Sequence, residues 1–130
     1  EMSQMVPVVL RFRDGRVVRV TLPGDEAPHA VVNAVDEAGE DLEVLLNSLK
    51  GVFYLKAERE RVLGLDADAA AQPSGPTATV EFDDGEVLTG RVAMFDVRQP
   101  GFFLIPAETQ SNNAKVYVVT AAVRSLELRP

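Results

Sequence analysis

The 130-residue chain contains no cysteine and no tryptophan, and its only histidine is His29. Without cysteine it forms neither disulfide bonds nor thiolate metal sites. A single histidine excludes a histidine metal cluster and leaves a catalytic triad only one candidate base. The sequence also lacks a nucleophile-elbow pattern and a glycine-rich phosphate-binding loop. We therefore predict a protein that is not an enzyme, with no catalytic residue, no metal and no cofactor.

Positive charge is scarce as well. Thirteen lysines and arginines stand against twenty acidic residues, which gives a formal net charge of −7. An acidic chain repels phosphate backbones, so nucleic acid is a disfavoured partner. The exception is local, because Arg11, Arg13, Arg16 and Arg19 flank one Asp-Gly pair. They form either a solvated hairpin face or, if Arg11 and Arg13 share a face, a small basic patch that suits a phosphate or a carboxylate.

Long apolar runs are missing too. No stretch is long enough to cross a bilayer, and no signal-peptide pattern opens the chain. We therefore expect a cytoplasmic location by default and no membrane insertion. Because the chain begins with Glu1, we also expect it to be part of a longer protein.

Acidic residues concentrate in one predicted loop, around Gly39. They are Asp36, Glu37, Glu40, Asp41 and Glu43. A calcium-binding loop needs oxygen ligands in the order Asp-x-Asp-x-Asp-Gly, and this order is absent. We therefore interpret these residues as a loop between two strands rather than as a calcium site.

What the chain does contain is an internal repeat. Residues 8–18 (VVLRFRDGRVV) are echoed by residues 78–88 (ATVEFDDGEVL), with a shared Phe-x-Asp-Gly. A repeat of this length indicates two copies of one small unit. Asp-Gly between two apolar runs is a strong hairpin signal, because glycine accepts the positive φ that a tight turn requires. Each copy is therefore predicted to open with a tight hairpin that turns at Gly15 or Gly85.

Two irregularities follow these turns. Val17 lies next to Val18, and Val87 next to Leu88, which interrupts the alternation of a half-buried strand. This predicts a bulge or a sharp bend at both places. Gly90 lies in the apolar phase of its strand, where a missing side chain lets another backbone approach closely.

The ends of the two copies match as well. Residues 44–55 (VLLNSLKGVFYL) align with residues 118–129 (VVTAAVRSLELR), and each reads as a strand, a one-turn helix and a final strand. We therefore predict an all-β protein of two small five-stranded barrels in tandem, each with a short helical turn before its last strand. Barrel closure removes exposed strand edges.

The boundaries follow from composition. A first barrel over 1–65 and a second over 77–130 are separated by a linker over 66–76, which is rich in small residues, proline and glycine. Units of this size are marginally stable alone, so we expect the two barrels to pack against each other or to self-associate. Phe53 and Tyr54 are adjacent, so one ring should point out of a regular strand and offer a contact.

The residues around the second turn resemble a known family. Residues 85–96 (GEVLTGRVAMFD) are similar to the first signature of Sm-like barrels, and residues 49–54 and 123–128 are similar to the second. SH3-type barrels fit nearly as well. The Sm-like resemblance implies assembly through strand edges and binding of single-stranded RNA, with Asp96, Lys50 and Arg124 as the nucleic-acid contacts.

The whole pattern also resembles uncharacterised bacterial tandem-barrel domains of signalling proteins. This resemblance and the missing catalytic groups lead to the main functional hypothesis, a non-catalytic protein-interaction or regulatory module of a larger bacterial signalling or scaffold protein. The alternative is a single-stranded RNA-binding or other nucleic-acid-binding module. Small barrels bind peptides at open strand edges or in aromatic grooves, and polar loops often carry binding residues. The expected contacts to a protein or peptide are Tyr54, Tyr117, Arg98, Asn112 and Asn113.

Overall fold

The computed structural model describes residues 6–24, 27–55, 76–92, 98–107 and 113–129. Within these residues the chain is all-β, as predicted, and ten strands form one antiparallel sheet. The strands of the first repeat (residues 6–55) are β1 (Val6–Phe12), β2 (Val17–Leu22), β3 (Val31–Asp36), β4 (Asp41–Leu45) and β5 (Leu49–Leu55). Those of the second repeat (residues 76–129) are β6 (Thr77–Phe82), β7 (Val87–Arg91), β8 (Gly101–Pro106), β9 (Asn113–Val119) and β10 (Val123–Arg129).

Both repeats have the same topology. The strand order across the sheet is β10-β6-β7-β8-β9-β5-β1-β2-β3-β4, so each repeat places its last strand beside its first. A short 3-10 turn precedes that last strand in both, at Leu46–Ser48 and at Thr120–Ala122. These turns lie where the sequence predicted a single helical turn.

The two Asp-Gly hairpins adopt the expected geometry. Gly15 has a φ of 99° and Gly85 a φ of 93°. In the second hairpin, the carboxylate of Asp84 accepts a hydrogen bond of 3.0 Å from the backbone N–H of Glu86. Asp14 accepts the matching bond from Arg16 at 3.0 Å. The aspartate thus stabilises the turn, while glycine supplies the left-handed backbone that the turn needs.

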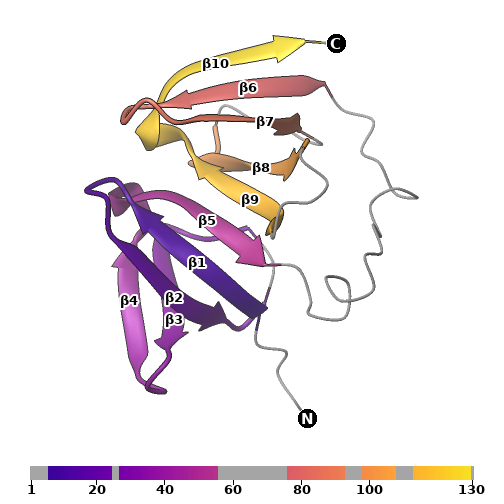
Figure 1. Cartoon of the computed structure of the whole chain (residues 1–130). Helices are drawn as coiled ribbons and strands as arrows, with labels where there is room; N and C mark the ends of the chain where they lie inside the picture. The colour runs from indigo at the N-terminus through magenta and orange to yellow at the C-terminus, as the bar shows by residue number, and fades with distance from the viewer. Residues whose placement is uncertain (1–5, 25–26, 56–75, 93–97, 108–112, 130) are drawn as a thin grey trace.

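The repeats join where β5 pairs with β9, and we call these two paired strands the seam. Phe53 lies opposite Val116 and Gly51 opposite Val118 in an antiparallel register. In Figure 1, β5 and β9 lie side by side in the middle of the molecule, with β4 and β10 at its two outer limits. A single sheet therefore runs through both repeats.

The seam also connects two hydrophobic cores. The first core draws its buried side chains mainly from the first repeat and the second core mainly from the second. Because successive side chains of a strand point to opposite faces, each seam strand serves both cores. Tyr54 of β5 packs in the first core, while Phe53 of the same strand packs in the second. Tyr117 of β9, a strand of the second repeat, packs in the first core. Of the two adjacent rings, one was expected to point out of the first unit and offer a contact, and Phe53 is that ring: it leaves the first core and packs in the second.

Of the bulge or sharp bend predicted at the start of the second strands, the bulge is absent. The pairing of β1 with β2 and of β6 with β7 runs without a register shift through these positions. Val17 and Val87 are simply exposed, at 62% and 56% of their surface. The register shifts where the last strand of each repeat meets the first, at Arg11/Phe12 and at Val123/Ser125.

Gly90 has the close neighbour that its position predicted. A Cβ atom at this position would collide with the carbonyl oxygen of Ile105, on the neighbouring strand β8. Most of the predicted linker lies outside the described residues, and β6 begins at Thr77, where the second barrel was expected to start. Among the described residues, no helix has the length and apolarity that crossing a membrane requires.

Replacement of Gly85 tests the turn geometry. Gly85→Val forces a β-branched side chain into a backbone with a φ of 93°, so we expect the free energy of unfolding to fall by about 1–3 kcal/mol. Gly24→Val is the matched control, because Gly24 has no positive φ and open space around its Cβ position. Urea unfolding measures both variants. Equal stability of the two would show that the turn does not need glycine.

Candidate functional site

The most buried charged residue among those described is Lys50, at the start of β5. Its side chain is only 4% exposed. The ammonium group donates a hydrogen bond of 2.8 Å to Asp84 and another to Glu86, both in the Asp-Gly hairpin of the second repeat. It also lies 4.9 Å from the centre of the Phe82 ring, which adds a cation–π contact. A lysine of the first repeat is thus held by the second.

Two arginines of the first hairpin extend this cluster. Arg11 forms an ion pair of 3.0 Å with Glu86, and Arg13 one of 3.5 Å with Asp83. The sequence left open a solvated hairpin face or a small basic patch, and in the structure Arg11 and Arg13 instead face carboxylates of the same chain. We call Arg11, Arg13, Lys50, Asp83, Asp84 and Glu86 together the inter-repeat charge cluster.

The charges of the two aligned hairpins could have indicated this cluster from the sequence. When the two hairpins are aligned, Arg11, Arg13 and Arg16 of the first copy correspond to Glu81, Asp83 and Glu86 of the second. The turn motif is shared while the flanking charges are reversed. Opposite charges at equivalent positions predict hairpins that attract one another, and two of the three arginines form pairs with the second hairpin.

The cluster lowers the pKa of two carboxyl groups. The hydrogen bond from Lys50 and that from the backbone N–H of Glu86 hold the pKa of Asp84 below its usual value. Partial burial raises the pKa of Glu86, but the hydrogen bonds from Lys50 and Arg11 outweigh this effect and leave the pKa lowered. Both groups therefore favour the charged form that pairs with the cations.

The inter-repeat charge cluster is better suited to holding the two repeats together than to catalysis. An ammonium group bonded to two carboxylates has no lone pair for nucleophilic attack. A cavity of about 200 Å³ adjoins the cluster, lined by Arg13, Lys50, Phe82, Asp83, Asp84 and Ala122. Among the residues that the structure describes, no group of three or more histidine, cysteine or acidic side chains could hold a metal ion.

The predicted peptide contacts do not form one surface. Tyr54 and Tyr117 are buried at the seam, where Phe103 lies between them at 5.8 Å and 5.0 Å between ring centres. Burial raises the pKa of Tyr117, and a hydrogen bond with the backbone of Gly101 partly offsets this. Lys115 covers the group, 4.4 Å from the centre of the Phe103 ring. These aromatic residues pack within the chain.

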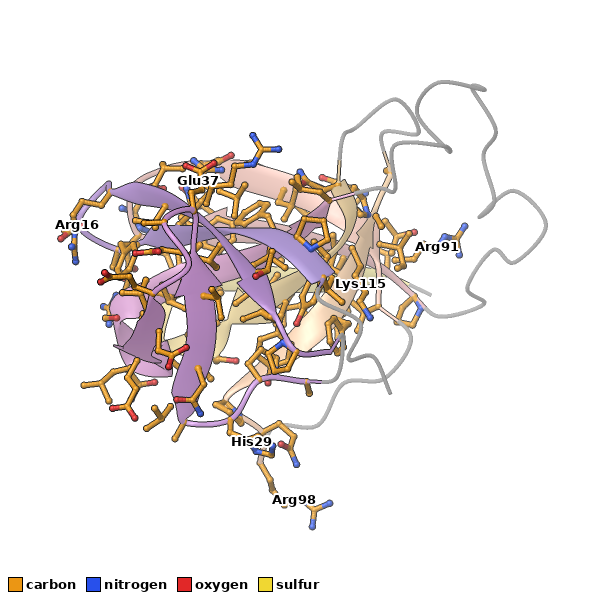
Figure 2. The ribbon with its side chains drawn as sticks, turned by 90° about the horizontal axis from the view of Figure 1, so that it is seen from below. Arg16, His29, Glu37, Arg91, Arg98 and Lys115 are labelled. Atoms are coloured by element: carbon orange, nitrogen blue, oxygen red, sulfur yellow. The ribbon has the colours of Figure 1, made fainter. Side chains whose placement is uncertain are left out.

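The other predicted contacts are scattered. Arg98 is exposed and points away from the ribbon (Figure 2), and Asn113 is half-buried at the start of β9. Asn112 falls outside the described residues, as does Asp96 of the nucleic-acid alternative. Of the other two nucleic-acid candidates, Lys50 is enclosed by carboxylates, and Arg124 forms an ion pair of 3.3 Å with Glu81.

A different feature, which the sequence did not reveal, lies at the limit of the sheet. In the described part of the chain, β4 pairs only with β3. The backbone N–H of Leu46 donates a hydrogen bond of 2.9 Å to the C=O of Ala30, and the N–H of Asp36 donates one of 2.9 Å to the C=O of Glu40. These two bonds fix which residues of β4 direct their backbone groups toward β3. Antiparallel pairing alternates, so Leu42 also directs its backbone groups toward β3.

The intervening residues direct their N–H and C=O groups away from β3. These residues are Asp41, Glu43 and Leu45, but the C=O of Leu45 accepts a hydrogen bond of 2.6 Å from the hydroxyl of Ser48. We call the outward backbone groups of Asp41 and Glu43 the open edge. A hollow of about 690 Å³ lies beside it, lined by Pro23, Asn33, Ala34, Val35, Asp41, Leu42 and Glu43. The surroundings are acidic, since residues 20–49 contain no lysine or arginine. A row of unpaired backbone groups is a template for another strand.

The comparisons with known proteins place the chain in a family. It belongs to the family of unknown function DUF6982, which matches residues 4–129. No curated protein and no solved structure matches the chain.

The lowered pKa values predict how stability changes with pH. A carboxyl group whose pKa is lower in the folded chain contributes stability that is complete above its unfolded value, near pH 4, and is lost as the pH falls through the folded value. We expect Lys50→Met to be less stable than wild type at pH 7 and this difference to shrink at about pH 3. Urea unfolding at both pH values measures it.

Arg19→Met is the control for this experiment. Arg19 is exposed on β2 and lies outside the charge cluster, so its variant should stay close to wild type at both pH values. If the deficit of Lys50→Met were the same at pH 7 and pH 3, the carboxylates would not be its cause.

Proposed function

We propose that the chain is a non-catalytic protein-interaction module of a larger bacterial signalling or scaffold protein. In this proposal, each half of the sheet curls into a small barrel of the SH3 or Sm-like type. The observation that carries the proposal is the open edge of β4, whose backbone groups pair with no strand in the described part of the chain and lie next to a hollow. A second protein chain satisfies such groups by adding a strand.

The distribution of charged groups supports a binding role over a catalytic one. Catalysis needs polar groups that converge on a cleft and are free to react. Here the converging groups are those of the inter-repeat charge cluster, and they satisfy one another. The open edge offers backbone hydrogen bonds and side-chain contacts, which are means of recognition rather than of bond cleavage.

The same groups favour a protein over a nucleic acid as the partner. Lys50 and Arg124 would carry phosphate contacts, yet both are paired with carboxylates. The net charge of −7 adds a general repulsion of phosphate. The open edge lies in a stretch without a basic residue.

Affinity capture tests the proposed function. The wild-type chain, immobilised as bait in nuclease-treated lysate of its source organism, should retain the same proteins as in untreated lysate. A labelled single-stranded oligouridylate should show no binding at low salt, where phosphate contacts are strongest. Loss of all captured protein after nuclease treatment, together with salt-sensitive oligonucleotide binding, would contradict the proposal and support the nucleic-acid alternative.

A further inference from the structure

The seam shows what kind of strand fits an edge such as β4. Within the repeat, β4 is the counterpart of β9, because each is followed directly by the 3-10 turn that precedes the last strand. Leu42 and Val44 thus correspond to Val116 and Val118. The outer side of β9 is occupied by β5, whereas that of β4 pairs with no described strand. The same position is filled in one repeat and open in the other.

This difference has a measurable consequence for burial. On β9, Val116 and Val118 are both 0% exposed, and Phe53 of β5 lies opposite Val116 in the second core. On β4, Leu42 and Val44 pack against the first core but remain only half-buried. A side chain that occupied the place of Phe53 would cover them. Gly51, opposite Val118, shows that a small residue fits the neighbouring inward position.

The residues of β4 whose side chains point away from the first core favour a different kind of side chain on an added strand. On the seam, Lys115 and Tyr117 of β9 lie opposite Tyr54 and Val52 of β5. Their counterparts on β4 are two exposed carboxylates, Asp41 and Glu43. Residues directly opposite one another on antiparallel strands attract when their charges are opposite. A strand added to β4 would therefore gain from basic residues at both outward positions.

We propose that β4 binds an extended antiparallel strand of a partner protein with the pattern small-basic-aromatic-basic. The small residue lies opposite Val44, the two basic residues opposite Glu43 and Asp41, and the aromatic residue opposite Leu42, where it enters the first core. This rests on the proposed function and adds to it the binding site and the chemical class of the ligand. Backbone hydrogen bonds with the open edge supply affinity, and the four side chains supply register and selectivity.

A second copy of the chain does not meet this pattern. Among the described strands, β10 lies at the other limit of the sheet, and it carries Ser125, Leu126, Glu127 and Leu128 at the four places. Glu127 would enter the first core opposite Leu42, and burial of an unpaired carboxylate is costly. The two leucines would lie opposite Glu43 and Asp41. Acidic groups on the edge also repel a second β4, which protects it from pairing with itself.

A peptide based on the β5 sequence tests the inference. The probe is fluorescein-labelled Leu-Lys-Gly-Lys-Phe-Lys-Leu, which is the β5 sequence with lysine at the two outward positions. Its control has glutamate in place of phenylalanine, as β10 does at the equivalent place. With the full-length chain, fluorescence anisotropy should show binding of the probe, and the control should bind at least about tenfold more weakly. Equal binding of the two peptides would overturn the proposed aromatic position.

Variants of the chain locate the site. Glu43→Pro removes an outward N–H without breaking the ladder to β3, so it should weaken probe binding by about tenfold or more with little change in melting temperature. Glu43→Lys, which keeps the backbone, should weaken it as well. Glu37→Lys makes the same charge change in the exposed turn before β4 and is the matched control. Unchanged binding by both Glu43 variants, or an equal loss with Glu37→Lys, would overturn the site.

The remaining outcomes separate this inference from the proposed function. If the probe does not bind while the Glu43→Pro bait still captures the wild-type set of proteins, the β4 site is wrong and the interaction module stands. If wild-type bait captures no protein, the proposed function itself fails. Concentration-dependent self-association in sedimentation that Glu43→Pro abolishes would show that the occupant is a second copy and would overturn the choice of partner.

Discussion

A strand at the limit of a sheet leaves a row of backbone hydrogen-bonding groups without partners, and the architecture of this chain depends on how those groups are satisfied. The pairing of β5 with β9 satisfies them at one junction. It converts two short repeats, each marginally stable on grounds of size, into a continuous ten-stranded sheet. Because the seam strands alternate their side chains between both cores, neither core is complete without the other repeat.

The two repeats have diverged at the positions where they meet. The hairpin of the first repeat is basic and that of the second is acidic, and the ammonium group of Lys50 bonds to two carboxylates of the acidic hairpin. On the last strands, Phe53 of the first repeat corresponds to Glu127 of the second. Phe53 completes the second core, whereas Glu127 remains exposed on β10. These differences favour pairing within one chain over pairing between chains, since the β10 edge presents a carboxylate where the seam needs an aromatic ring.

Local features of the fold could be predicted from the sequence. The repeat, the turns at Gly15 and Gly85 and the 3-10 turns all follow from short-range rules about glycine and alternating apolar residues. The close neighbour of Gly90 followed from the same reasoning. The predicted bulge at Val17 is absent because this valine is exposed at the start of its strand, so the two adjacent valines do not both have to be buried.

The seam and the open edge could not be predicted in this way, because both depend on pairing between distant parts of the chain. Alternation along the strand predicts that Phe53 and Tyr54 point to opposite faces, but it does not show which ring leaves the first core or what covers it. The structure supplies a second core on the other side of the strand. The site residues Tyr54 and Tyr117 were chosen for their aromatic character, and that same character leads to their burial at the seam.

Residue-resolved amide hydrogen exchange tests most directly whether β9 is covered while its counterpart β4 is open. The amides of Lys115 and Tyr117 on β9 should be protected, since β5 lies on their outer side, and those of Leu42 and Val44 should be protected by β3. The amides of Asp41 and Glu43 should exchange rapidly. Protection of Asp41 and Glu43 equal to that of Lys115 and Tyr117 would show that the edge is not open. Rapid exchange at Lys115 and Tyr117 would show that the seam does not form.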